Sequence, residues 1–296
     1  MRSVSGPIAR VLAAASLAVW AAEARGTPPP VAAPPPAHAM ENASYFFRAR
    51  DGSILTLLTL DLRAGPAEAP SVAAGDGGPG FAGEVSVEET GRRGEALPNT
   101  SPRTVPLEVL PFTGTGARAA FFGTVYLQPG KTYSVRYAVT DGARDEILVR
   151  NAVVGVPDLT RGFTASSIVP AEQFGPAGPS AAHFQVGSEA VVPKAGAVFR
   201  RSELLRLYLQ VYDAAIDAKT SLPRVDVVFR FYRAVNGRSK RHGKPFSVRG
   251  ASGASMGLAL PIGDWPEGAY RVEVELRDRV VEQRMTAEGR FSIASD

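Results

Sequence analysis

Two stretches of the chain share one pattern of alternating apolar and polar residues. Residues 129–141 and residues 266–278 each contain a Pro/Gly turn, then a tyrosine, then apolar residues at every second position, and finally an aspartate. The two tyrosines, Tyr133 and Tyr270, are 137 positions apart, as are the two aspartates. Alternation with a period of two leaves one face of a strand buried and the other in solvent. The pattern therefore predicts two copies of one antiparallel β architecture.

The same pattern predicts the fold class. A tyrosine just before an alternating run is typical of the tyrosine corner of immunoglobulin-like sandwiches, in which the phenol hydroxyl bonds nearby backbone. Thirty glycines and 24 prolines, with few periodic runs of helical length, favour short strands joined by turns. A length of 296 residues, 45% of them hydrophobic, is enough for two such cores. We predict an all-β fold with two tandem immunoglobulin-like antiparallel β-sandwiches.

The N-terminal end is typical of an export signal. Arg2 and Arg10 precede an apolar stretch that is too short to span a bilayer and ends at a small-x-small cleavage site. The alternative is that these residues are an internal helix of a larger protein whose true start lies upstream. A tract rich in proline follows, which favours a stiff polyproline II tether.

Domain boundaries follow changes in the pattern. Alternation begins near Tyr45, weakens after Asp158 and returns, more regular, in residues 205–211. The predicted segments are a signal peptide (1–24), a proline-rich linker (25–43), a first β-sandwich (44–158), an interdomain connection (159–196) and a second β-sandwich (197–296).

Composition excludes several kinds of chemistry. The chain has no cysteine, so disulfides and thiol chemistry are excluded. Its three histidines, His38, His183 and His242, lie far apart and do not have metal-ligand spacing. A net charge of +4 is too small to indicate nucleic-acid binding. We expect no cofactor and no nucleic-acid partner.

Two local matches to functional motifs lack the context that the chemistry needs. Gly253-Ala-Ser-Met-Gly257 fits the nucleophile elbow, but residues 258–265, which include Pro261, cannot be the helix that must follow. Asp141, Asp145 and Glu146 lie in one turn that could hold calcium, but their spacing differs from that of known calcium loops and Arg144 lies among them. We expect no catalytic or metal-binding residues and no enzymatic activity.

One segment concentrates positive charge. Residues 236–244 contain Arg238, Lys240, Arg241 and Lys244, with Asn-Gly and His-Gly pairs that predict a protruding hairpin loop. Such a loop could bind acidic polysaccharide, phospholipid headgroups or an acidic protein face. A soluble loop that prevents strand-to-strand aggregation would explain the same residues.

Aromatic side chains are predicted beside this loop. Tyr208, Tyr212 and Tyr232 occupy outward strand positions and could form a patch or pack against a neighbouring domain. Trp265 lies in a Pro/Gly turn, where it could stack on a sugar or pack beneath the turn. The predicted interaction surface comprises Arg238, Lys240, Arg241, Lys244, Tyr232 and Trp265.

Three segments carry a resemblance to a known group of proteins. LQPGKTYSVR (127–136), VGVPDLT (154–160) and FRRSELLRLYLQVY (199–212) resemble the C-terminal β-rich region of bacterial VWFA-related proteins common in Acidobacteria, and the C-terminal region of GWxTD-domain proteins is similar. The resemblance covers roughly residues 45–296. Neither the GWxTD motif nor the D-x-S-x-S metal motif occurs in the chain. The resemblance implies an exported β module, found beside an interaction domain, with no catalytic residues to carry over.

These observations lead to one expected function and one alternative. We expect an exported, non-enzymatic β-sandwich protein, periplasmic or secreted, that serves as a structural or protein-binding module of the bacterial envelope. Its partner would be another envelope protein or domain, and no transmembrane anchor is expected. The alternative is an accessory carbohydrate-binding module of an envelope enzyme system, with Trp265 and Tyr232 stacking on sugar rings.

Overall fold

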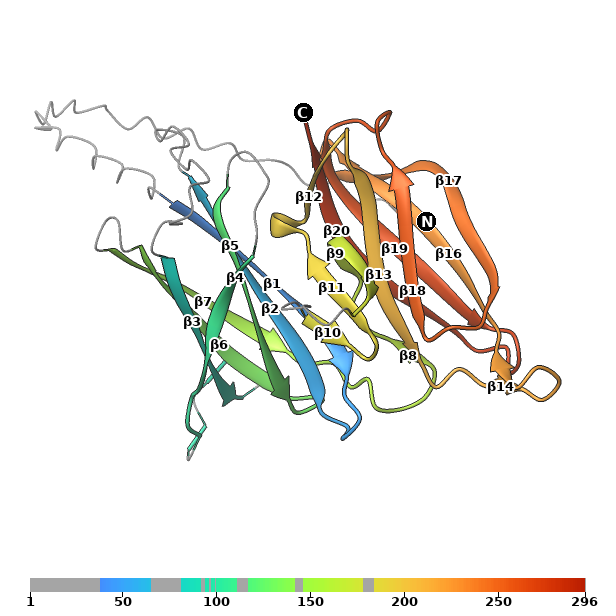
Figure 1. Cartoon of the computed structure of the whole chain (residues 1–296), viewed down its shortest axis with the longest axis horizontal. Coiled ribbons are helices and arrows are strands. Elements are labelled where there is room, and N and C mark those ends of the chain that lie inside the picture. Colours follow the sequence, from blue (N-terminus) through green and yellow to red (C-terminus); the bar gives the residue numbers. More distant parts are fainter. Residues whose placement is uncertain are drawn as a thin grey trace, which may run out of the picture. The chain divides into compact units, whose positions relative to one another are not determined.

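The computed structural model describes residues 38–64, 81–91, 94–95, 97–98, 100–110, 117–141, 146–177 and 184–295 (Figure 1). Within these ranges the chain is mostly β-strand and contains no α-helix; a short 3-10 turn, η1, covers Ala195–Ala197. The prediction of an all-β fold is confirmed. The predicted signal peptide, most of the predicted linker, and the side chains of Asp141, Asp145 and Glu146 lie outside the described residues.

The first sheet has seven antiparallel strands in the order β1-β2-β5-β4-β3-β6-β7. Strand β4 pairs with β3 through residues 103–107 and with β5 through residues 108–110, so it joins the two parts of the sheet. Arg150 on β7 donates a hydrogen bond to Asn42 on β1, which brings the two end strands together. The strands are β1 (His38–Arg48), β2 (Ile54–Ala64), β3 (Phe81–Thr90), β4 (Arg103–Leu110), β5 (Ala117–Leu127), β6 (Thr132–Asp141) and β7 (Glu146–Gly155).

The remaining described strands form two further sheets and one small two-stranded hairpin. A six-stranded sheet has the order β10-β11-β9-β13-β18, with β8 also paired to β13, and a five-stranded sheet has the order β12-β20-β19-β16-β17. The pair β12 and β20 is parallel, and the other pairs are antiparallel. The six-stranded sheet contains β8 (Thr164–Ala165), β9 (Val169–Pro176), β10 (Phe184–Val186), β11 (Glu189–Pro193), β13 (Leu204–Tyr212) and β18 (Ser255–Pro261). The five-stranded sheet contains β12 (Val198–Arg200), β16 (Val225–Val235), β17 (Arg238–Ala251), β19 (Gly268–Asp278) and β20 (Arg284–Ala294), and the small hairpin contains β14 (Ile216–Asp217) and β15 (Leu222–Pro223).

Two predicted boundaries differ from the observed strands. Strand β1 begins at His38, inside the range predicted as linker, because residues 38–43 pair with residues 59–64 of β2 through the main chain. The range 159–196, predicted as a connection, contains β8, β9, β10 and β11. These strands are short and β9 includes Pro170 and Pro176, so they show little alternation in sequence. The described residues belong to one compact unit.

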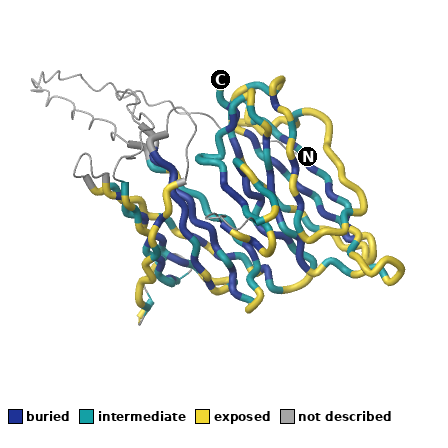
Figure 2. Tube along the Cα trace, viewed as in Figure 1, coloured by how far each residue is buried: buried dark blue, intermediate teal, exposed yellow. Residues whose placement is uncertain are grey.

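Most residues of strand β13 are buried, on both of its faces (Figure 2). Leu205, Leu207 and Leu209 pack in a core cluster with apolar side chains of β16 and β19, as their alternation predicts. Tyr208, on the opposite face, packs in a separate cluster with residues of β1, β2, β5 and β9 to β11, including Phe47.

The prediction that Tyr208 and Tyr212 are exposed is therefore wrong, since only 1% and 8% of their surfaces are accessible. Tyr212 accepts a hydrogen bond from the backbone N–H of Arg48, whose guanidinium lies 4.6 Å from the ring centroid. Burial raises the pKa of Tyr212 to about 12. Outward strand positions become interior ones wherever a second layer of structure covers them.

The tyrosines that begin the two matching strands bond the backbone of the preceding turn. The Tyr133 hydroxyl accepts a hydrogen bond from the N–H of Gln128 at 3.1 Å. The Tyr270 hydroxyl donates to the carbonyl oxygen of Pro266 at 2.6 Å. The predicted hydroxyl-to-backbone contact is confirmed at both positions.

Candidate binding face on the C-terminal sheet

The basic segment is a strand and not a loop. Asn236 and Gly237 have φ of 49° and 74° and form a two-residue turn, which brings Val235 directly opposite Arg238. Positive φ at both central residues is the geometry that an Asn-Gly pair favours in a tight hairpin. The prediction of a protruding loop over residues 236–244 is wrong because the turn is complete at Gly237 and strand β17 begins at the next residue.

Strand β17 is an edge strand of the five-stranded sheet, paired on one side by β16. All of its residues except His242 and Ala251 are exposed. Lys240 lies opposite Arg233 and Arg241 opposite Tyr232, so cations project from both faces of the strand. Among the described residues, no carboxylate forms an ion pair with any of the four predicted cations, Arg238, Lys240, Arg241 and Lys244.

The two predicted aromatic contact residues are already in contact with other side chains. The guanidinium of Arg271 lies 4.4 Å from the centroid of the Tyr232 ring, in a cation–π arrangement. Trp265 is partly buried and packs against Phe231 at 5.0 Å, His242 at 4.6 Å and Tyr270 at 5.4 Å between ring centroids. Of the two interpretations of Trp265, packing beneath its turn matches these contacts.

His242 belongs to the same aromatic group. Its pKa is lowered, first by burial and then by the positive charge of Arg233. The Arg233 side chain is held in place by two hydrogen bonds to the carbonyl oxygen of Glu267. The inward side of the β16–β17 hairpin therefore carries a packed aromatic cluster at His242, and Arg233 and Lys240 follow it on the same face toward the turn.

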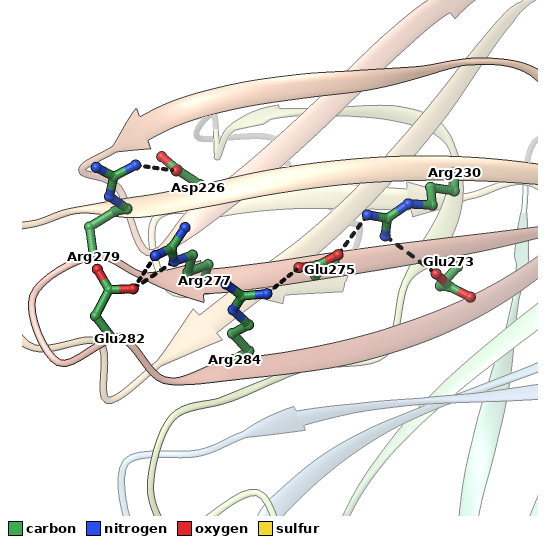
Figure 3. Close-up of polar contacts among 8 residues, drawn as sticks. All are labelled: Asp226, Arg230, Glu273, Glu275, Arg277, Arg279, Glu282 and Arg284. Atoms are coloured by element: carbon green, nitrogen blue, oxygen red, sulfur yellow. Dashed lines mark hydrogen bonds and ion pairs between the residues drawn. The ribbon is translucent and has the colours of Figure 1, made fainter.

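The outer face of this sheet carries a chain of alternating charges (Figure 3). Arg230 on β16 contacts Glu273 at 3.4 Å and Glu275 at 2.6 Å on β19. Arg271 contacts Glu273 at 3.6 Å and also pairs with Glu288. The chain ends at Arg284 of β20, which lies 3.7 Å from Glu275. Pairs this exposed stabilise the fold only weakly, but together they fix the directions of the guanidinium groups.

At the Arg284 end of this chain lies a shallow depression of about 350 Å³. Its charged lining consists of Arg249, Arg277, Arg279, Arg284, Asp226 and Glu275. Arg279 bonds Asp226 at 2.9 Å, and the N–H of Gly250 donates to the same carboxylate at 2.9 Å. Burial acts to raise the pKa of Asp226, but these two donors outweigh it and the pKa is lowered.

This depression was not predicted from the sequence. Three of its arginines, Arg277, Arg279 and Arg284, lie close together in the sequence around the β19–β20 turn, and the fourth, Arg249, comes from β17. A further signal is the alternation Arg271, Glu273, Glu275, Arg277 on β19, which places these four charges on one face of a strand.

Ser255, the central residue of the G-x-S-x-G match, begins strand β18 and accepts a hydrogen bond from the Tyr208 hydroxyl at 3.3 Å. The segment that follows is a strand, so the strand-turn-helix context of a nucleophile elbow is not present here. Gly257 lies beneath the Phe174 ring, where an added Cβ would come within 2.2 Å of a ring carbon.

Within the described ranges, no group of three or more histidine, cysteine, aspartate or glutamate side chains is placed to hold a metal ion. The part of the chain that the structure describes also contains no helix with the length and apolar character needed to cross a membrane.

Comparisons with known proteins give no family for this chain. No family model matches it, and no curated protein matches its sequence. Among solved structures it is similar to a DUF4785 family protein from Legionella pneumophila, with 10% sequence identity and a TM-score of 0.24. The match covers 86% of this chain and 56% of that one, so the chain spans little more than half the length of the protein it matches. A similarity this weak carries no argument about function.

Proposed function

We propose that this protein is an exported, non-enzymatic β-sandwich module of the bacterial envelope that binds another envelope protein. The two matching strands and their tyrosine contacts support a tandem pair of immunoglobulin-like sandwiches as its architecture. The observation that carries the proposal is strand β17, an exposed 14-residue edge whose first seven residues include four cations, Arg238, Lys240, Arg241 and Lys244, without ion-pair partners among the described residues.

An edge strand can accept one more strand. The N–H and C=O groups on the side of β17 away from β16 are available to an extended segment of a partner, and such strand addition takes affinity from main-chain hydrogen bonds and specificity from side chains. Because Lys240 and Arg241 are neighbours in the strand, they point to opposite faces. An acidic partner strand would therefore meet positive charge on both faces.

The same charges limit self-association. Two copies of β17 placed side by side would bring like charges together, which is unfavourable, and lysine on an edge strand is a common protection against aggregation. The basic edge therefore favours an acidic partner strand over a second copy of itself.

The test uses peptides that isolate strand addition. A ten-residue peptide that alternates glutamate with valine should bind the full chain with an affinity that falls as salt rises. Methylation of alternate peptide nitrogens should weaken binding, because it removes main-chain donors. A peptide with lysine in place of glutamate should not bind.

A four-site variant connects binding to the strand. Replacement of Arg238, Lys240, Arg241 and Lys244 by serine should abolish binding of the glutamate peptide. The matched control replaces four exposed cations elsewhere by serine, at Arg136, Arg161, Lys219 and Arg290, and should bind as the unmodified chain does. Equal binding by both variants would contradict a role for β17.

The carbohydrate-binding alternative requires free aromatic faces. Tyr232 and Trp265 each contact other side chains of this protein, so neither supports that alternative. Glycan-array binding that is lost in Trp265→Ala would favour it over protein binding.

Export has its own test. A native product that begins near Arg25 and is found outside the cytoplasm would support it. A larger polypeptide that contains this sequence would show that residues 1–24 are internal and would move the search for function to the additional part.

A further inference from the structure

We infer that the depression lined by Arg249, Arg277, Arg279 and Arg284 is an oxyanion-binding site, which takes a carboxylate, sulfate or phosphate group. This inference goes beyond the proposed function, because it does not depend on peptide binding along residues 238–244. The site lies on the outer face of the five-stranded sheet, where β16, β17, β19 and β20 contribute side chains.

The depression has an excess of positive charge. The lining contains four guanidinium groups and two carboxylates, Asp226 and Glu275. Glu275 is already bonded to Arg230 at 2.6 Å, outside the lining. The depression therefore has more positive charge than its own carboxylates can neutralise, and an anion would restore the balance.

Two of the arginines, Arg277 and Arg279, are held in position by carboxylates. Arg279 is fixed by its 2.9 Å bond to Asp226, which is fixed in turn by the N–H of Gly250. Arg277 is fixed by Glu282, to which its Nε donates at 2.7 Å (Figure 3). A guanidinium carries five N–H donors, so each group keeps donors beyond those its carboxylate uses. These two side chains give a positively charged wall that is oriented before any ligand arrives.

The other two arginines, Arg249 and Arg284, make few contacts with carboxylates among the described residues. Arg284 has one ion pair among the described residues, to Glu275, and its 3.7 Å length is beyond hydrogen-bond distance. Arg249 has no ion pair within the described residues, although its charge helps to lower the pKa of Asp226 and so acts at the depression. Two exposed guanidinium groups thus retain their paired N–H donors, the geometry that binds an oxyanion with two parallel hydrogen bonds.

An NMR titration of the full chain tests the inference. The probes are sodium sulfate, sodium phosphate and sodium acetate, each added at constant ionic strength, while the Nε–Hε signals of the arginines are followed. Saturable shifts of Arg249 and Arg284 are expected with at least one probe. Saturation with sulfate or phosphate identifies a tetrahedral anion as the ligand, and saturation with acetate identifies a carboxylate.

Three variants locate the binding. Arg249→Gln and Arg284→Gln should each weaken it about tenfold, the typical effect of losing one charged hydrogen bond. Arg290→Gln, an exposed arginine on the same face of β20 that does not line the depression, is the matched control and should bind like the unmodified chain. Shifts that rise linearly without saturation, or that are equal in all three variants, would overturn the inference.

The serine variant of the β17 cations separates the two proposals. It should lose the glutamate peptide yet bind the inorganic anion with unchanged affinity. Loss of anion binding in that variant would overturn a distinct site at the depression.

Discussion

Removal of single hydroxyl groups from three buried tyrosines tests whether hydrogen bonding to the turn stabilises the two matching strands. Tyr270, Tyr133 and Tyr137 are all at least 93% buried, and the change to phenylalanine leaves each ring in place. Their hydroxyls differ: Tyr270 donates to a carbonyl oxygen at 2.6 Å, and Tyr133 accepts from an N–H at 3.1 Å. The Tyr137 hydroxyl is buried and has no hydrogen-bond partner in the described chain. Burial raises the pKa of Tyr137; Ser44 and Asn42 act in the opposite direction, but neither meets hydrogen-bond geometry with its hydroxyl.

The expected losses follow from these contacts. Tyr270→Phe removes one well-formed hydrogen bond and should cost about 1 kcal/mol, which lowers Tm by roughly 2 to 4 °C in a chain of this size. Tyr133→Phe should cost about half as much, because Gln128 is exposed and its N–H can bond water instead. Tyr137→Phe should be neutral or stabilising, because it removes a buried polar group that lacks a partner.

The assay is equilibrium denaturation in urea, with calorimetry as a second measurement. The order of destabilisation should be Tyr270, then Tyr133, then Tyr137. Equal losses at all three positions, or the largest loss at Tyr137, would refute the argument that the turn contacts stabilise these strands. Near-ultraviolet circular dichroism checks that the stacked rings of Tyr270 and Phe291, 5.3 Å apart, remain in place.

Three further perturbations follow from single contacts. Asp278→Ala should destabilise the fold by about 3 kcal/mol or more in the urea assay, because this fully buried carboxylate accepts hydrogen bonds from three backbone N–H groups. The control Asp264→Ala, at an exposed position, should change stability little. The pKa of His242 is lowered in the folded state, so the unfolded chain binds more protons and the stability of the fold should decrease as the pH drops below the ordinary histidine pKa. In thermal melts, His242→Gln should reduce the dependence of Tm on pH between about pH 7 and 5. Gly257→Ala should cost about 1 to 3 kcal/mol, because its Cβ would meet the Phe174 ring. In a Phe174→Ala background, Gly257→Ala should cause no further loss of stability. The same loss in that background would contradict the steric cause.

Local sequence determined the strands and their turns. The alternation in residues 205–211 predicted one buried face, and Leu205, Leu207 and Leu209 lie in the core. The contacts of Tyr133 and Tyr270 span only four or five residues, so a short motif encodes them. The Asn236-Gly237 pair likewise encodes a tight turn, although the predicted loop extended to residue 244 and the observed turn ends at Gly237.

Tertiary structure decided which faces are open and which charges meet. Tyr208 and Arg206 both occupy the face of β13 opposite to Leu205, Leu207 and Leu209, which the alternation predicted to be exposed. Tyr208 is nevertheless only 1% exposed, because a second layer of side chains covers it. Arg249 meets Arg277 and Arg284 only because β17 lies in the same sheet as the β19–β20 hairpin. Periodicity and turn preference act over a few residues, whereas the order of strands and the packing of sheets depend on contacts between distant segments. For that reason most of the long strands could be predicted from the sequence, whereas the short strands of residues 159–196 and the approach of Arg249 to the arginines of the β19–β20 hairpin could not.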